Sequence, residues 1–259
     1  MLRPRIIPCL LLQGERLVKT ISFAEPRYVG DPINAVRIFN EKQVDELMVI
    51  DIDATVKNKS PNFALIEKLA AQSRMPLTYG GGIRSVEHAK RIIELGIEKV
   101  AMSSAAIESP DLVEKLAASV GTQSVVVVLD CQRRAASNYE VVICRGTKNT
   151  GASPAKLARD FELTGAGEIV LNSVQNDGRM EGYDLELVEQ VRAVTKIPIT
   201  VLGGAGSTQH IGELFDRFGI VGAAAGSLFV FKGVYRAVLL NYPNEKERSD
   251  LFEKILNTK

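Results

Sequence analysis

Three aspartates stand at or just beyond the ends of apolar, strand-like segments. Asp130 ends one such run, Asp51 ends another, and Asp177 follows a third. Carboxylates in these positions can act as general acids or bases, and two of them in different environments can divide the roles. We therefore interpret Asp130 and Asp51 as candidate catalytic residues, although Asp51 would equally suit the orientation of a neighbouring lysine. Asp53, two residues later, fits a loop or helix cap.

Glycine pairs follow two further strand-like segments. Gly80-Gly81-Gly82 and Gly203-Gly204 each lead into a segment with helical periodicity. Glycines let backbone N–H groups come close to an anion, and the amino end of a helix favours negative charge. A glycine pair alone is also typical of a tight turn, but the recurrence of the pair favours phosphate binding. The predicted ligand has a phosphate at each end, held by Gly81, Gly82, Ser103, Ser104, Gly203, Gly204, Gly226 and Ser227.

The glycine pairs belong to a longer internal repeat. Pro76–Ile83 is matched by Pro198–Ala205, and Leu47–Asp51 is matched by Glu168–Asn172. The offset is about half the chain, which is too long for a solenoid with repeats of about 20–50 residues. We therefore expect one domain over residues 1–259, with half-barrels at about 1–121 and 122–240 and a C-terminal helix at 243–259.

Strand-like and helical segments alternate along the chain. Apolar, β-branched runs predict strands at Arg5–Leu12, Leu47–Ile52, Pro76–Tyr79, Lys99–Ser103, Ser124–Cys131, Glu168–Asn172, Ile197–Leu202 and Ile220–Ala225. Amphipathic segments predict helices at Pro61–Ser73, Val86–Leu95, Pro110–Ser119, Pro154–Thr164, Leu185–Thr195 and Thr208–Phe218. Ser-Pro pairs at 60–61, 109–110 and 153–154 are typical helix starts, and Gly96 and Gly165 are typical helix ends. This order predicts an α/β protein with a single (β/α)8 TIM barrel built from two duplicated half-barrels, with an open doubly wound sheet as the alternative.

The composition fits a soluble globular domain. The 259 residues are 46% apolar and 24% charged, with a net charge of +1, and α/β barrels of about 250 residues form single domains. The balanced charge gives no general reason to expect a nucleic-acid or membrane partner. Cys9, Cys131 and Cys144 lack a CxxC spacing, and the N-terminus lacks the apolar core of a signal peptide. We expect a cytoplasmic protein with structural thiols, no metal site and no cofactor.

A set of short motifs carries a resemblance to a known family. The motifs are Arg5-Ile-Ile-Pro-Cys9, Gly30-Asp-Pro32, Asp51-Ile-Asp-Ala54, Gly80-Gly-Gly-Ile83, Gly121-Thr-Gln-Ser124, Gly165-Ala-Gly-Glu168, Asn176-Asp-Gly178 and Gly203-Gly-Ala-Gly206. Together, over nearly the whole chain, they resemble the cyclase subunit of imidazole glycerol phosphate synthase. The resemblance implies a heterodimer in which a class-I glutaminase at the bottom of the barrel supplies ammonia. The ammonia is then used at the top on a phosphorylated small molecule with two phosphates.

The resemblance assigns roles to individual residues. It implies that Asp130 is the second catalytic acid and that Lys19 lies in the first active-site loop, whereas the first catalytic acid falls on Leu11. Asp177 and Gly178 join the phosphate contacts.

Four charged residues stand at the starts of predicted strands: Arg5, Glu46, Lys99 and Glu168. Strand starts often face solvent and carry charges for that reason alone. Their alternating signs would allow a closed ring, and the resemblance implies such a ring as the gate of an ammonia tunnel. We expect an exposed ring in which each ion pair contributes only ~0–1 kcal/mol. Glu98 would then face the glutaminase.

Departures from the family concentrate at the top of the expected barrel. Leu11 stands in place of an aspartate, Ser103-Ser104 in place of an asparagine-threonine pair, and Gln175 in place of an aspartate. Loss of a proton-transfer group costs a factor of ~10²–10⁴ in rate, so ordinary cyclisation is not expected. The segments Cys9–Leu12 and Ala24–Gly30 resemble cyclase paralogues associated with amidine formation on amino sugars of bacterial surface polysaccharides.

Three functions therefore stay open. The favoured one is a barrel subunit that works with a glutaminase and a third amidotransferase protein on an acidic amino sugar. A genuine cyclase of histidine biosynthesis would need another group in place of the missing carboxylate. A non-catalytic scaffold that only conducts ammonia would have no need of Asp130 or of the phosphate contacts.

Overall fold

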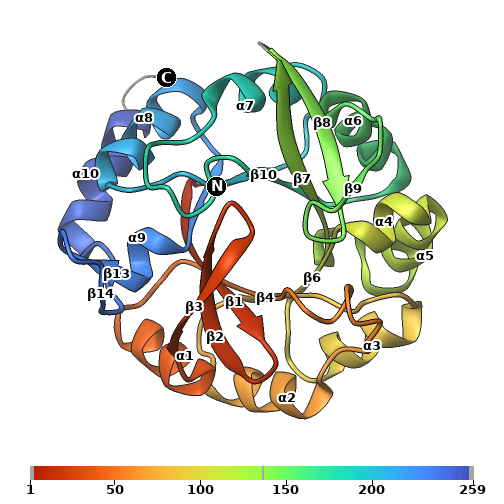
Figure 1. Ribbon diagram of the computed structural model, residues 1–259, viewed down its shortest axis with the longest axis horizontal. Helices are drawn as coiled ribbons and strands as arrows, with labels where there is room; N and C mark the ends of the chain where they lie inside the picture. Colours follow the sequence, from red (N-terminus) through yellow and green to blue (C-terminus); the bar gives the residue numbers. More distant parts are fainter. Residues whose placement is uncertain (1–2, 136, 257–259) are drawn as a thin grey trace.

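Eight parallel strands close into a barrel in the computed structural model, which describes residues 3–135 and 137–256 (Figure 1). Each strand pairs in parallel with its neighbours, and β12 pairs with β1 to complete the ring. This closure confirms the predicted (β/α)8 barrel and excludes the open doubly wound sheet. In order around the ring, the strands are β1 (Arg5–Gln13), β4 (Leu47–Asp51), β5 (Leu77–Gly80), β6 (Lys99–Met102), β7 (Val125–Ala135), β10 (Glu168–Ser173), β11 (Ile199–Leu202) and β12 (Gly222–Ala225).

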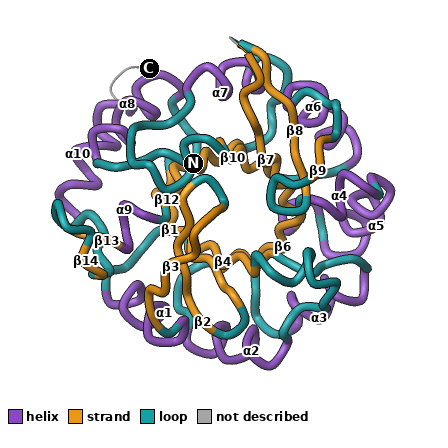
Figure 2. Tube along the Cα trace, in the orientation of Figure 1, coloured by secondary structure: helices purple, strands orange, loops and turns teal. Residues whose placement is uncertain are grey.

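Helices cover the outside of this ring (Figure 2). Outward-facing strand residues such as Ile6, Val49 and Leu171 pack with the apolar helix faces in one core cluster. The strands are therefore apolar on both faces, as is usual for a parallel sheet covered by helices. The helices are α1 (Pro32–Glu41), α2 (Phe63–Gln72), α3 (Val86–Glu94), α4 (Ser104–Glu108), α5 (Pro110–Val120), α6 (Pro154–Thr164), α7 (Leu185–Arg192), α8 (Thr208–Phe218), α9 (Ser227–Val230) and α10 (Glu245–Leu256), with a 3-10 turn at Thr122–Ser124.

Helix starts follow the predicted Ser-Pro pairs in part. The Ser153 hydroxyl accepts the Lys156 N–H and caps α6, and the left-handed Gly165 ends that helix. At 60–61 the prediction is wrong, because Asn62 caps α2 by accepting the Leu65 N–H at 3.1 Å, so the helix begins two residues later. Ser109 stands at the cap position of α5 without a side-chain bond to the helix.

Two hairpins extend the barrel at equivalent places in the two halves. After β1 come β2 (Arg16–Ile21) and β3 (Ala24–Gly30); after β7 come β8 (Asn138–Ile143) and β9 (Lys148–Asn149). A smaller hairpin joins β13 (Phe231–Lys232) to β14 (Ala237–Val238). β3 and β9 are largely exposed and lack the apolar runs that predict strands, whereas β2 and β8 are largely buried. None of the helices in the described ranges has the length and apolarity needed to cross a bilayer.

Candidate functional site

A cavity of about 140 Å³ lies where the barrel strands end. Leu11, Ile50 and Val128 form an apolar wall, and both Leu11 and Asp130 line the space. Strand alternation explains this placement, because every second residue of β1 and β7 points into the barrel. Polar side chains and glycines from the strand ends, loops and hairpins complete the mouth: Lys19, Asp51, Gly81, Gly82, Ser103, Ser104, Arg145, Asn172, Asp177 and Gly226.

The Asp130 carboxylate is held by two side chains. Asn172 Nδ2 donates to its Oδ1 at 2.9 Å, and Ser103 Oγ donates to its Oδ2 at 3.2 Å. Burial raises the pKa of this carboxyl to about 6; the two hydrogen bonds oppose the increase, and the charge of Asp177 adds to it. A group with this pKa exchanges protons near neutral pH, which suits a general acid or base.

Asp51 organises the loop that follows β4. Its Oδ1 accepts the N–H groups of Asp53 at 2.9 Å and Ala54 at 3.0 Å. Burial raises the pKa of Asp51, and these backbone bonds oppose the increase. The neighbouring lysine is held by Asp53 instead, through an ion pair with Lys57. Asp51 therefore lines the cavity with one oxygen occupied by its own loop.

One set of candidate phosphate contacts opens directly onto the cavity: Gly81, Gly82, Ser103 and Ser104. Gly81 and Gly82 have φ values of 112° and 74°. A Cβ at Gly81 would collide with the Asp51 carbonyl oxygen, so packing alone already demands glycine there. Ser104 Oγ accepts the Cys144 N–H at 3.0 Å, which ties this set to the β8–β9 turn.

The second set follows β10, β11 and β12 and is more enclosed, since all six residues are buried: Asp177, Gly178, Gly203, Gly204, Gly226 and Ser227. Of these six, Asp177 and Gly226 line the cavity. Lys19 Nζ donates to Asp177 Oδ1 at 2.8 Å, and both side chains are buried. A Cβ at Gly204 would collide with the Gly182 carbonyl oxygen. Ser227 Oγ is buried without a hydrogen-bond partner, which leaves a free hydroxyl on this side.

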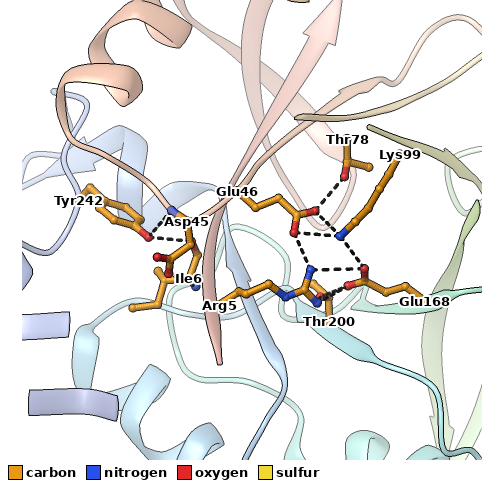
Figure 3. A network of polar contacts seen from close by, with 9 residues as sticks. All are labelled: Arg5, Ile6, Asp45, Glu46, Thr78, Lys99, Glu168, Thr200 and Tyr242. Atoms are coloured by element: carbon orange, nitrogen blue, oxygen red, sulfur yellow. Dashed lines mark hydrogen bonds and ion pairs between the residues drawn. The ribbon is translucent and has the colours of Figure 1, made fainter. Parts of the chain in front are cut away.

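The opposite end of the barrel carries a closed ring of four charges (Figure 3). Arg5 donates to Glu46 at 2.5 Å and to Glu168 at 2.7 Å, and Lys99 reaches the same two carboxylates at 2.9 and 3.0 Å. Thr78 and Thr200, not identified from the sequence, donate to Glu46 and Glu168. The internal repeat was the signal that could have identified them, because Glu46 and Thr78 recur as Glu168 and Thr200 at one common offset.

Burial makes this ring different from the exposed one expected. The side chains of Glu46 and Glu168 are 4% and 7% exposed, and those of Arg5 and Lys99 are 23% and 18% exposed. Burial would raise the pKa of Glu168, but Arg5 and Lys99 outweigh it and hold the pKa at about 2. The prediction of an exposed ring was therefore wrong. The contribution of ~0–1 kcal/mol per pair applies to exposed pairs, whereas breaking a buried pair costs about 3–5 kcal/mol.

A second network beside the ring fixes the start of β1. Asp45 accepts the Ile6 N–H at 2.9 Å, and the Tyr242 hydroxyl donates to the Ile6 carbonyl at 2.8 Å (Figure 3). Glu98 precedes Lys99 and is exposed, with its own N–H bonded to the Leu77 carbonyl. Its side chain is accessible at the end of the barrel that carries the ring.

Between the ring and the mouth, the barrel interior is apolar. The inward-facing cluster contains Ile7, Cys9, Met48, Ala101, Val126, Val170, Leu202 and Ala224. Burial raises the pKa of Cys9 to about 12, so its thiol stays neutral at physiological pH.

Two residues of the mouth show what sequence reasoning missed, and Gln175, noted from the sequence, lies outside the cavity lining. Asn172 and Arg145 line the cavity, but neither belongs to a motif with a recognisable spacing. Asn172 was detectable as an amide two positions after an inward-facing strand residue. Gln175 bonds to the backbone of Arg133 at 3.0 and 3.1 Å, so it fixes the β7–β8 hairpin.

Comparisons with known proteins decide the family. The model of the family described as "Histidine biosynthesis protein" matches residues 5–236. The chain belongs to this family. It is a HisF-like chain, 55% identical over 97% of its length to all of the Leptospira borgpetersenii protein named "Putative imidazole glycerol phosphate synthase subunit HisF".

A relative with a paralogue name is more similar to this chain than a relative named simply as HisF. The Pseudomonas aeruginosa relative named as subunit hisF2 is 48% identical over 94% of this chain and 97% of its own length. The Streptococcus sanguinis protein named "Imidazole glycerol phosphate synthase subunit HisF" is 39% identical over 88% of this chain and 91% of its own length. The resemblance stated from the motifs is confirmed, and the pattern of names is consistent with a paralogue.

Proposed function

We propose that this protein is the barrel subunit of a two-subunit glutamine amidotransferase that supports amidine formation on an amino sugar of a surface polysaccharide. One observation carries the proposal: a complete buried ring of charges stands at one end of the barrel, whereas the other end holds Leu11 across from Asp130. This combination supports a protein that keeps an ammonia gate at one end and lacks one of the two proton-transfer groups of cyclisation at the other.

Ammonia from a class-I glutaminase enters, in this proposal, through the ring of Arg5, Glu46, Lys99 and Glu168. Neutral ammonia can cross the apolar interior without the desolvation cost of an ion. Lys99 is the ring member best suited to move, because its ammonium is a single charge on a flexible stem, whereas Arg5 grips both carboxylates with a rigid fork. Rotation of Lys99 would open the ring while Arg5 keeps the two glutamates paired.

At the mouth, Asp130 is the acid–base group, with its pKa of about 6. Leu11 supplies no proton, so a reaction that needs two proton-transfer groups at once is disfavoured. Lys19 and Asp51 complete the polar wall. A phosphorylated small molecule would contact Gly81, Gly82, Ser103 and Ser104 on one side and Asp177, Gly178, Gly203, Gly204, Gly226 and Ser227 on the other.

The partners follow from the two ends. The glutaminase would dock on the face that carries the ring, with Glu98 at the contact, to form a heterodimer. A third amidotransferase protein would take the ammonia at the mouth and bind the amino sugar.

A genuine cyclase of histidine biosynthesis is the second candidate. It is favoured by Asp130, whose pKa suits proton transfer, and by the glycine and serine contacts at both sides of the mouth. It requires a group other than Leu11 to replace the first acid.

A reconstituted system separates the two. The protein is mixed with a class-I glutaminase from the same source, and complex formation is measured by analytical ultracentrifugation. One mixture also contains the third amidotransferase protein and the amino sugar, and another contains the family's bisphosphate substrate. With glutamine labelled in the amide nitrogen, mass spectrometry follows the label into the amino sugar or into an imidazole product. We expect a complex, weakened by Glu98→Lys but not by Glu114→Lys on the exposed side of α5, and label in the sugar.

Two results would contradict the proposal. One is the absence of any complex at micromolar concentrations. The other is imidazole formation by the wild-type chain at ordinary enzymatic rates of ~1–10³ per second, which would make the histidine pathway its function.

A further inference from the structure

Two cations line the mouth cavity within the described ranges, Lys19 and Arg145. They differ in how far their charges are already paired within the protein. Lys19 is buried and bonded to Asp177 at 2.8 Å, and its Cε occupies the space that a Cβ at Gly226 would need. Its charge is thus matched at short range before any ligand arrives.

Arg145 is held by two longer contacts. Its Nη1 lies 3.5 Å from Asp53 Oδ1, and its Nη2 donates to the Phe23 carbonyl at 3.2 Å. The other oxygen of Asp53 is paired with Lys57, so Asp53 keeps a cation if Arg145 turns away. A guanidinium has five N–H donors, and the side chain is 28% exposed. Arg145 therefore has donors to spare at the mouth.

The turn between β8 and β9 presents Arg145 to the cavity. Cys144, Arg145 and Gly146 have φ values of 53°, 58° and 77°. Left-handed conformations are unfavourable for residues with a side chain, and they persist only where the surroundings enforce them. Here the Cys144 N–H is fixed by Ser104 Oγ at 3.0 Å, and in Figure 1 the β8–β9 hairpin lies beside α4, which Ser104 opens. The turn is thus tied to the open set of glycines and serines, and Arg145 lines the same cavity as this set.

We propose that Arg145 is the specificity-determining cation that recognises one oxyanion of the ligand beside Gly81, Gly82, Ser103 and Ser104. The inference rests on the proposed function in that it assumes a small anionic ligand at this mouth. An arginine fork matches the paired oxygens of a phosphate or a carboxylate. The opposite side, where Lys19 is bound to Asp177, receives no free cation. Recognition of the ligand's charge is therefore concentrated at one end.

Titration of the isolated chain with inorganic phosphate, sodium acetate and sodium chloride tests this assignment. Binding is followed by calorimetry and by the ¹⁵Nε resonance of Arg145 in arginine-labelled protein. We expect one saturable phosphate site at which Arg145→Gln weakens binding roughly tenfold to a hundredfold, the range for a charge-assisted hydrogen bond. The phosphate affinity of Arg145→Lys should lie between those of the wild type and Arg145→Gln. Acetate in place of phosphate as the tighter anion would identify the ligand group as a carboxylate.

Arg134→Gln is the matched control, because Arg134 lies on the adjoining β7–β8 hairpin and pairs with Glu140 outside the cavity. It should leave phosphate binding unchanged. Equal affinity of the wild type and Arg145→Gln for both anions would overturn the proposal, as would equal losses in Arg145→Gln and Arg134→Gln. Thermal melts of each variant report folding. The glutaminase complex does not enter this measurement, so the proposed function can fail while Arg145 stands, and the reverse.

Discussion

Replacing Asp130 by asparagine should stabilise the protein at neutral pH. The two side chains have the same shape, and the hydrogen bonds can be kept: the amide oxygen accepts from Asn172 Nδ2, and the amide nitrogen faces the Ser103 hydroxyl, which can accept. The change therefore removes the buried charge without leaving a new unpaired group. This is the condition under which a substitution reports the cost of a charge and little else.

The sign follows from the raised pKa. With a native pKa of about 6 against an ordinary value of 3.8, the native state keeps a proton that the unfolded chain has released. Stability therefore falls as the pH rises through this window, and the whole penalty is present above pH 6. The pKa difference corresponds to about 3 kcal/mol at most. The side chain is partly exposed to the cavity, so we expect a gain of about 1–3 kcal/mol in Asp130→Asn.

Thermal and urea unfolding between pH 3.5 and 8 measure this difference. For a chain of this size the gain corresponds to roughly 2–4 °C in the unfolding midpoint per kcal/mol. The gain should shrink as the pH falls below 6 and vanish near 3.8. Asp216→Asn, on the exposed face of α8, is the control and should show no such profile. A constant difference across the range, or a less stable Asp130→Asn at pH 8, would refute the reasoning.

Two further substitutions test the ends of the barrel. Lys99→Ala should release ammonia into solution instead of delivering it. It should also lower the free energy of unfolding by up to about 3–5 kcal/mol, because Glu46 and Glu168 stay buried with Arg5 alone. The free ammonia released per glutamine hydrolysed and a thermal melt check both effects, and unchanged delivery would count against a gate. Leu11→Asp should raise cyclisation of the family's bisphosphate substrate with added ammonium by at most ~10²–10⁴; a rate no higher than that of the wild type would show that position 11 does not limit this reaction.

The fold could be read from the sequence because its strands are buried on both faces. Long apolar runs such as Val125–Leu129 leave little choice of element, and most predicted strand ends agree closely with the structure. The β2–β3 and β8–β9 hairpins could not be predicted in the same way. Most of β3 and β9 is exposed, so no apolar run marks these two strands, and they are held by pairing with β2 and β8. β2 and β8 are short and mostly buried, and the apolar run Val141–Ile143 was a strand signal that the prediction missed.

The candidate site was predictable only where a residue's role follows from its strand position. Asp130 was expected at the mouth because it ends a predicted strand, and Leu11 because the resemblance puts the first catalytic acid at its position. Arg145 reaches the mouth through a turn with left-handed backbone, which no sequence pattern announced. The burial of Glu46 was missed because a strand start ordinarily faces solvent, whereas here the ring closes over it.

Strand geometry explains how one end of the barrel can change while the other is kept. On β1, Arg5, Cys9 and Leu11 share the inward face; Arg5 pairs with Glu46 and Glu168 in the ring, and Leu11 lines the mouth. Leu11 lies six positions after Arg5 on this strand, a distance of about 20 Å at the usual rise per residue. In the proposed function, a leucine at position 11 therefore removes a proton-transfer group at the mouth without touching an atom of the ring. The chemistry at the top of such a barrel can diverge residue by residue, because the inward faces of the strands hold the proposed ammonia path independently of it.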